Sequence, residues 1–211
     1  MPFNDQTITG LLEEASNPKC LLILAHGAGA GMHNAFMNDL SRELVQNGIS
    51  TLRFNFPYME AGRKSPGSPK TNIAAWDAVL TYVLREYNLP VFISGKSYGG
   101  RMVSHLLAQE PSKEVKGIVY FGFPLHAPGK DSKDRAAHLI DVRVPQLFIQ
   151  GTRDALANLA LINEVSSELD QSDIKIIEGG DHSFKVKGTD QKSIIEMLAT
   201  HTANWVDSVL N

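Results

Sequence analysis

The chain has 211 residues, of which 43% are hydrophobic and 20% are charged, and its formal net charge is −3. This length and composition are typical of a globular protein, and we expect residues 1–211 to form a single domain. A slightly acidic chain lacks the clustered Lys and Arg that nucleic acids and anionic membranes attract, so we expect neither of these as a partner and a small molecule as the ligand.

The N-terminal segment carries few structural signals. Residues around Phe3 to Leu12 are a candidate for an antiparallel edge strand on a larger sheet. They lack the basic region and apolar block of a signal peptide, and no run of 18 apolar residues occurs anywhere in the chain. Cys20 has no partner for an internal disulfide, and we expect it to be a buried, inert thiol. These features predict a cytoplasmic protein.

Six short apolar runs follow one another along the chain, with amphipathic helical patterns between them. Such runs are typical of strands covered on both faces, and they lie at 20–25, 49–54, 91–94, 117–121, 146–150 and 174–177. Apolar residues at helical spacing over 73–87 and 194–209 predict helices that pack on the sheet. The alternation predicts an α/β fold with six parallel strands and helices on both faces. Two loops rich in turn-forming residues, 58–72 and 124–136, follow strands and can border a site.

A glycine-rich loop, HGAGAG at 26–31, directly follows the first of these strands. A dinucleotide-binding fingerprint would need G-x-G-x-x-G, but its third glycine would fall on Met32 or on Asn34. The second strand contains Arg53 where an acidic residue would bind a ribose, although an arginine there could suit a 2′-phosphate and keeps a nucleotide-binding alternative open. Small residues also let the backbone approach a reacting group closely, which a hydrolase needs.

The stretch VFISGKSYGG at 91–100 can be read in two incompatible ways. A phosphate-binding loop, G-x-x-x-x-G-K-[ST], would need a glycine five positions before Gly95, where Pro90 stands, and it would have to begin before the predicted strand. A G-x-S-x-G turn instead needs a strand before it and a helix after it, and the flanking segments supply both. The second reading fits, and it makes Ser97 the candidate nucleophile.

A serine hydroxyl needs a base to take its proton, and that base needs a carboxylate to orient it. In folds that use this turn, the acid follows the serine in the chain and the histidine follows the acid. Asp154 lies just beyond the fifth predicted strand and His182 just beyond the sixth, so both can reach the same edge of the sheet as Ser97. We therefore predict Ser97 as nucleophile, His182 as general base and Asp154 as the orienting acid.

Other residues compete for these roles. Four further histidines are His105, His126, His138 and His201. Of these, only His126 and His138, which flank the loop after the fourth strand, could overhang the site, because the other two lie inside predicted helices. Asp131 and Asp134, in that same loop, are the reserve candidates for the acid.

Attack on a carbonyl creates a negative oxygen that preorganised backbone amides stabilise. The amide that follows the nucleophile, at Tyr98, and an amide of the glycine-rich loop, at Ala28, are the predicted donors. No H-E-x-x-H motif, paired C-x-x-C motif or dense carboxylate cluster occurs, so we expect no metal and no cofactor.

The residues that would bind the rest of a substrate are not identified by any motif. Several cations near predicted strand ends could favour an anionic substrate: Arg53, Arg63, Lys96, Arg101 and Arg153. Three large side chains could line an apolar pocket for an acyl group: Tyr58, Met59 and Phe123.

The motifs HGAGAG, GKSYGG, GTRD and GGDHSF occur in this order, and with them the chain resembles the α/β-hydrolase superfamily from Cys20 to Leu210. More narrowly, RFNFPYMEAG, GKSYGGRM, GFPLHAPGK and QGTRD resemble a small dienelactone-hydrolase-like subgroup. This subgroup is related to the hydrolase-like region of a subunit of the non-specific lethal chromatin complex and to a testis-expressed homologue. True dienelactone hydrolases use a cysteine where this chain has Ser97. The resemblance implies an α/β-hydrolase fold without a large cap, and it implies the roles given above for Ser97, Asp154, His182, Tyr98 and Ala28.

Two functions are consistent with these features. The first is a serine hydrolase that cleaves carboxylic esters or related acyl bonds of small molecules through an acyl-enzyme intermediate. The alternative is a hydrolase fold retained as a binding or assembly module with little catalysis, as in the chromatin-associated relatives of the subgroup.

Overall fold

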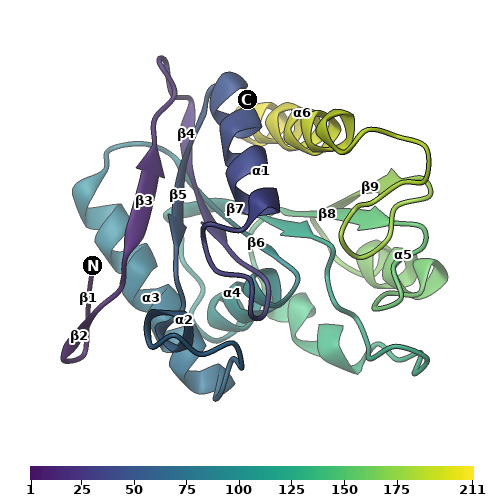
Figure 1. Ribbon diagram of the computed structural model, residues 1–211, viewed down its shortest axis with the longest axis horizontal. Coiled ribbons are helices and arrows are strands. Elements are labelled where there is room, and N and C mark those ends of the chain that lie inside the picture. The colour runs from purple at the N-terminus through teal and green to yellow at the C-terminus, as the bar shows by residue number, and fades with distance from the viewer.

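The computed structural model describes residues 1–211. Its main sheet has seven strands in the order β3-β5-β4-β6-β7-β8-β9, with helices on both faces (Figure 1). Six strands run parallel: β4 (Cys20–Ala25), β5 (Ile49–Phe54), β6 (Val91–Lys96), β7 (Val115–Phe121), β8 (Gln146–Gly151) and β9 (Ser172–Ile177). The predicted parallel sheet is therefore confirmed, and no large cap covers it.

The N-terminal segment divides into two parts. β3 (Gly10–Glu13) pairs antiparallel with β5 and forms one edge of the sheet, as predicted. The residues before it instead form a separate hairpin of β1 (Pro2–Phe3) and β2 (Gln6–Thr7). Its turn contains Asn4 at φ 50°, a backbone conformation that asparagine tolerates better than most residues. The edge strand is consequently shorter than the predicted segment from Phe3 to Leu12.

The helices bury two apolar clusters, one on each face of the sheet. One face is covered by α1 (Ala35–Gln46) and α6 (Gln191–Leu210), and the other by α3 (Pro69–Glu86), α4 (Tyr98–Gln109) and α5 (Leu159–Ser167) (Figure 1). Successive side chains of β4 alternate between the two clusters, which explains why that strand reads as a continuous apolar run. Cys20 at its start is fully buried, as predicted, and burial raises the pKa of its thiol to about 12.

The two turn-rich loops contain short helices that the sequence analysis did not predict. α2 (Pro57–Glu60) and α3 each begin with a proline, whose missing amide hydrogen costs nothing at the start of a helix. A 3-10 helix, η1 (Asp134–Asp141), follows β7 and buries Ala136 and Leu139 at the three-residue spacing of that helix type. None of the helices is both long and apolar enough to cross a membrane.

The strand order places a topological switch point between β4 and β6. From β4 the chain adds β5 on one side and later β6 on the other, so the loops that leave β4 and β6 diverge. Ligands of open parallel sheets bind at such a point, at the carboxyl ends of the strands. The glycine-rich loop follows β4 and Ser97 follows β6, so both lie at this switch point.

Candidate active site

Ser97 lies in a sharp turn between β6 and α4. Its backbone has φ 51° and ψ −112°, a conformation that residues other than glycine seldom adopt. The turn requires small neighbours, because a Cβ on Gly95 would lie 2.2 Å from the Gly100 nitrogen and a Cβ on Gly99 would lie 2.7 Å from the Ala25 oxygen. Close backbone packing therefore explains both glycines of the G-x-S-x-G pattern.

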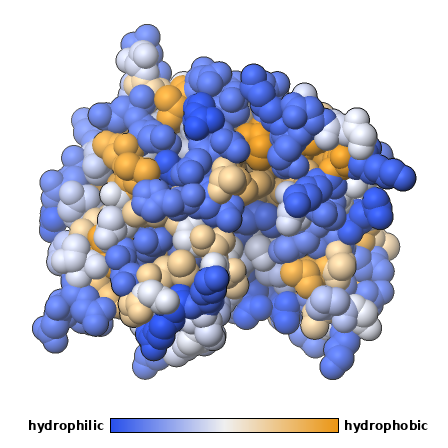
Figure 2. Space-filling view, viewed as in Figure 1, coloured by the Kyte–Doolittle hydropathy of each residue, from blue (hydrophilic) through white to orange (hydrophobic).

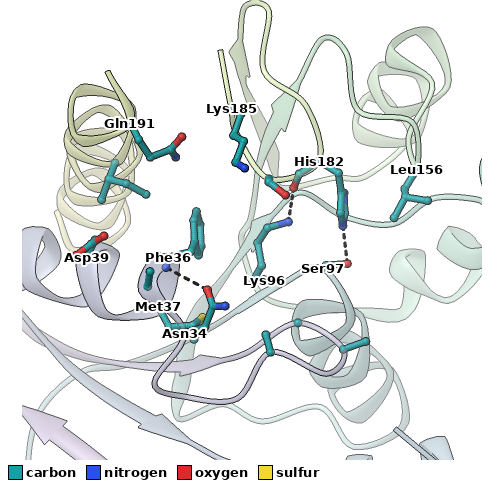
Figure 3. A pocket seen from close by; sticks show the side chains of 16 residues that line it. Asn34, Phe36, Met37, Asp39, Lys96, Ser97, Leu156, His182, Lys185 and Gln191 are labelled. Atoms are coloured by element: carbon teal, nitrogen blue, oxygen red, sulfur yellow. Dashed lines mark hydrogen bonds between the residues drawn. The ribbon is translucent and has the colours of Figure 1, made fainter. Parts of the chain in front are cut away.

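Two hydrogen bonds join the three residues that the sequence analysis predicted as nucleophile, base and acid. His182 Nε2 lies 2.8 Å from Ser97 Oγ, which Figure 3 shows, and His182 Nδ1 lies 2.7 Å from Asp154 Oδ2. If Nδ1 carries the proton and donates it to the carboxylate, Nε2 is free to accept the proton of the serine. The side chain of Asp154 is 1% exposed and that of His182 is 27% exposed. The carboxylate is thus shielded from water, whereas the imidazole can reach a ligand.

Two further donors hold the Asp154 carboxylate in place. Gln150 Nε2 donates to Oδ2 at 2.6 Å, and the Leu156 backbone amide donates to Oδ1 at 2.8 Å. Burial raises the pKa of Asp154, but the hydrogen bond and charge of His182, with help from the Leu156 amide, outweigh burial and hold this pKa below its usual value. The carboxylate is therefore ionised at neutral pH and can stabilise a protonated His182.

The loop that carries His182 is fixed by contacts of its own. Asp181 Oδ1 accepts a hydrogen bond from the Lys185 amide at 2.9 Å, which closes a tight turn around His182. A Cβ on Gly151 would lie 2.2 Å from the Gly180 oxygen, so the end of β8 and this loop pack backbone against backbone. Gly151 and Gly180 therefore permit the close backbone packing that places the loop of His182 against the end of β8.

Lys96, the residue before Ser97, also contacts this loop. Its Nζ donates to the His182 carbonyl oxygen at 2.6 Å (Figure 3). The ammonium lies 5.3 Å from the ring centroid of Phe184 and 6.0 Å from that of Phe36, within range of cation–π attraction. Lys96 thus joins the strand end that carries the serine to the loop that carries the histidine.

The glycine-rich loop lies against the turn at Ser97. Ala25 pairs with Gly95 across β4 and β6, and a Cβ on Gly27 would lie 3.8 Å from Ser97 Cβ. The Ala28 amide has no hydrogen-bond acceptor, and the Tyr98 amide, as the first of α4, has no acceptor within its helix. The two amides predicted as oxyanion donors are therefore next to Ser97 in the chain or in space and are not satisfied by regular structure.

His26 and Tyr58 hold the glycine-rich loop in place through hydrogen bonds. His26 is fully buried, its Nδ1 donates to the Gly27 oxygen at 2.7 Å, and its Nε2 accepts from the Phe56 amide at 3.2 Å. Burial lowers the pKa of His26, which favours this neutral form. The Tyr58 hydroxyl accepts from the Gly29 amide at 3.2 Å, so Tyr58 holds the loop instead of lining the predicted acyl pocket.

Arg53 does not face a ligand. It is 1% exposed, and its Nη2 pairs with Glu13 Oε2 at 2.9 Å. Its Nη1 donates to the Met32 backbone oxygen at 3.0 Å and to Asn38 Oδ1. The suggested contact with a 2′-phosphate or an anionic substrate is therefore wrong, because the guanidinium is buried against protein acceptors. It ties the end of the glycine-rich loop to edge strand β3.

A cavity of about 610 Å³ opens beside Ser97 and His182 (Figure 3). One wall comes from the start of α1, including Asn34 and Phe36, and another comes from the start of α6, including Gln191. A mostly apolar lining with a few polar groups is typical of sites for small molecules. The sequence analysis did not predict these walls.

Most of the suggested substrate-binding residues lie outside this cavity. Among the suggested cations only Lys96 lines it, and the three suggested apolar residues do not. The reserve acids Asp131 and Asp134 do not line it either. No group of three or more His, Cys, Asp or Glu residues has the arrangement that could hold a metal ion.

The competing histidines are also placed elsewhere. His126 is buried, its Nε2 accepts from the Asn158 amide at 2.8 Å, and its Nδ1 donates to the Ala127 oxygen at 2.9 Å, so it joins the loop after β7 to the start of α5. His105 and His138 stack on each other between α4 and η1, with ring centroids 3.6 Å apart. Like His201, none of them lines the cavity beside Ser97.

The stacked histidines predict a loss of stability in acid. Burial, followed by the neighbouring His105 and Arg101, lowers the pKa of His138 to about 3, and burial also lowers the pKa of His105. An unfolded histidine titrates near pH 6.5, so below that pH only the unfolded chain gains these protons. The stability present above about pH 6.5 is therefore lost as the pH falls toward 3, by at most about 1.4 kcal/mol per pH unit for His138.

Urea unfolding at about pH 7 and about pH 5, for the unmodified chain and for His138→Gln, measures this effect. Glutamine keeps a polar partner for Ser104 Oγ, which lies 2.7 Å from His138 Nε2. Between the two pH values the variant should lose about 1–2 kcal/mol less free energy of unfolding than the unmodified chain. Equal losses would show that His138 is protonated in the folded state.

Comparison with known proteins agrees with this architecture. A family model described as an alpha/beta hydrolase domain matches residues 18–209. Est1E from Butyrivibrio proteoclasticus is similar at a TM-score of 0.76 and 14% identity, over 99% of this chain and 97% of its own. A dienelactone hydrolase from Anabaena variabilis is similar at a TM-score of 0.76 and 19% identity, over 96% of this chain and 92% of its own. A serine hydrolase without lid from Xanthomonas campestris is similar at a TM-score of 0.74 and 18% identity, over 94% of this chain and 88% of its own. At these identities the likeness shows the fold alone.

Proposed function

Because this chain belongs to the alpha/beta hydrolase domain family, we propose that it is a serine hydrolase that cleaves carboxylic esters or related acyl bonds of small molecules. The observation that carries this proposal is the line of two hydrogen bonds from Asp154 through His182 to Ser97. A buried carboxylate, an imidazole and a serine hydroxyl in this order form the arrangement that activates serine for attack on a carbonyl. We also propose that residues 1–211 act as one domain, since both apolar clusters pack on the same sheet.

In the first half of the proposed reaction, Ser97 Oγ attacks the acyl carbon while His182 Nε2 takes its proton. The carbonyl oxygen becomes negative and accepts hydrogen bonds from the Tyr98 and Ala28 amides, each of which contributes about 3 kcal/mol in comparable sites. His182 then gives its proton to the leaving alcohol, and the acyl group remains on Ser97. Asp154 stays ionised and stabilises the imidazolium that forms in between.

In the second half, a water molecule replaces the alcohol. His182 takes a proton from this water as it attacks the acyl carbon, and the same two amides stabilise the second oxyanion. Collapse of that intermediate returns the proton to Ser97 Oγ and releases the carboxylic acid. The exposed fraction of His182, 27%, leaves room for water to reach it.

The resemblance of RFNFPYMEAG, GKSYGGRM, GFPLHAPGK and QGTRD to a subgroup with chromatin-associated relatives is the basis of a second proposal, a binding or assembly module. A surface that binds partner proteins usually exposes a contiguous apolar patch. The face in Figure 2 is mostly hydrophilic. Over the whole chain the exposed large hydrophobic side chains are Ile140, Ile176, Met197 and Leu210. The hydrolase therefore has the stronger support, and the labelling experiment below can also favour the binding module.

Intact-mass labelling with a fluorophosphonate probe tests the proposed function. The unmodified chain should gain one adduct, because an activated serine displaces fluoride from the probe, and Ser97→Ala should gain none. Ser104→Ala, which removes a hydroxyl that bonds His138 instead, is the matched control and should label like the unmodified chain. A folded chain that gains no adduct, or a Ser97→Ala variant that still does, contradicts the proposal and directs attention to binding partners.

A further inference from the structure

Two lysines from distant parts of the chain line the cavity beside Ser97. Lys96 ends β6, and Lys185 belongs to the loop between β9 and α6. In Figure 3 both ammonium groups are directed toward the space between the start of α1, the start of α6 and His182. A ligand that enters this space therefore meets two cations close to the reacting serine.

Neither lysine forms an ion pair with the protein, although Asp154 and Asp181 attract the Lys96 ammonium from farther away and Lys185 is exposed. No carboxylate lies within 4.0 Å of either ammonium, although such pairs occur elsewhere in the chain. The bond to the His182 oxygen uses one of the three N–H donors of Lys96 and leaves two unpaired. Lys185 Nζ has no hydrogen-bond partner, since only the backbone amide of that residue donates.

Burial makes the missing counter-charge costly at Lys96. Burial lowers the pKa of this ammonium to about 8, and the attraction of Asp154 and Asp181 only partly opposes the effect. A carboxylate placed against Nζ would form a short, charge-assisted hydrogen bond and would favour the protonated form. The site thus gains more from an anionic ligand than from a neutral one.

The rest of the cavity lining agrees with such a ligand. Its one acid, Asp39, already pairs with Arg42 at 3.1 Å. Asn34 uses its side-chain oxygen to accept from the Phe36 amide, which leaves its Nδ2 group as a donor. Phe36, Met37 and Ile195 supply apolar contacts for a hydrocarbon chain. The lining thus contains two cations and one acid, together with apolar surface.

We propose that the substrate of this site carries a carboxylate on its acyl part, several bonds from the ester, and that Lys96 and Lys185 bind this carboxylate. The inference rests on the proposed function and deepens it, because it assigns a substrate class: monoesters of dicarboxylic acids. The ester carbonyl would lie at Ser97, the hydrocarbon chain along the apolar wall, and the free carboxylate against the two ammonium groups.

A matched pair of esters tests the assignment. Monoethyl adipate and ethyl hexanoate have acyl chains of the same length and differ in the terminal carboxylate, and released ethanol measures turnover of both. The unmodified chain should prefer the adipate by about ten- to a hundredfold in kcat/KM, mainly through KM, because a hydrogen bond between charged groups contributes that much affinity. A preference for the hexanoate, or no preference, would overturn the assignment.

Variants show whether the lysines cause the preference. Lys96→Met and Lys185→Met should each reduce the ratio between the two esters at least about threefold, whereas Lys96→Arg should retain most of it. Lys187→Met is the control, since Lys187 is exposed and does not line the cavity. It should leave the ratio unchanged. If Lys96→Met keeps the full ratio, the carboxylate is bound elsewhere and the assignment is wrong.

Failure of this inference can be told apart from failure of the proposed function. If turnover of ethyl hexanoate needs Ser97 but the adipate is not preferred, the proposed hydrolase function is supported. The assignment of dicarboxylic acid monoesters as substrates is then wrong. If neither ester is turned over, calorimetry with Ser97→Ala decides. This variant should bind monoethyl adipate at least about tenfold more tightly than ethyl hexanoate and should lose that advantage when Lys96→Met is added. Equal binding overturns the assignment.

Discussion

His182→Ala should lower kcat/KM for a short-chain ester by about 10⁴-fold or more. Without the imidazole, nothing within hydrogen-bond distance of Ser97 Oγ can take its proton, because His182 Nε2 is its one basic neighbour at 2.8 Å. The other histidines cannot substitute, since none of them lines the cavity. The loss should appear in kcat more than in KM, because the base acts as the reaction proceeds and contributes little to ground-state binding.

His33→Ala is the control for this variant. His33 is exposed in the loop that follows the glycine-rich segment, and it does not line the cavity, so its removal should change kcat/KM by less than about threefold. Circular dichroism of both variants should match that of the unmodified chain, because the side chain of His182 is partly exposed. If His182→Ala keeps more than about a tenth of the activity, His182 is not the base.

Gly95→Ala should destabilise the chain by at least about 3 kcal/mol, even though it adds a single methyl group. The new Cβ would lie 2.2 Å from the Gly100 nitrogen and 2.4 Å from the Gly99 carbonyl carbon. These are backbone atoms, and they cannot turn aside as the end of a flexible side chain can. Either the first turn of α4 must move away from β6, or the chain loses much of its modest total stability.

Gly27→Ala provides the matched comparison, because its Cβ would meet only ordinary contacts, beginning at 3.6 Å from the Lys96 oxygen. Urea unfolding of the two variants should place Gly27→Ala within about 1 kcal/mol of the unmodified chain and Gly95→Ala far below it. A Gly95→Ala variant as stable as Gly27→Ala would mean that β6 and α4 are less closely packed than the structure has them.

The order of strands and helices could be read from the sequence because parallel strands are buried on both faces. Their apolar runs are continuous, and each of the six predicted runs begins within two residues of the start of the observed strand, with full agreement for Cys20–Ala25 and Ile49–Phe54. β9 lies at the edge of the sheet and much of it is exposed, so its apolar run is shorter than the strand. η1 was missed because two buried residues three apart do not make a detectable period.

The residues joined by hydrogen bonds at Ser97 were predicted because each follows a strand and the fold brings those ends together. The supporting contacts were not predictable in the same way. Gln150 reads as one polar residue in a buried strand, and its bond to Asp154 depends on which face of β8 it occupies. The cavity walls come from the first turns of α1 and α6, which are far apart in the chain and lie side by side because both helices pack on the same face of the sheet and on each other.

The buried contacts of Arg53 place a boundary on the smallest chain that can keep this site intact. The family match begins at residue 18, but the carboxylate that neutralises Arg53 belongs to Glu13, before that point. A chain trimmed to the matched residues would lose both this acid and β3, so Arg53 would lose its ion-pair partner at the edge of the sheet. The same guanidinium holds the Met32 oxygen at the end of the glycine-rich loop. The smallest chain that keeps this site intact therefore starts at β3, before the residues that the family model matches.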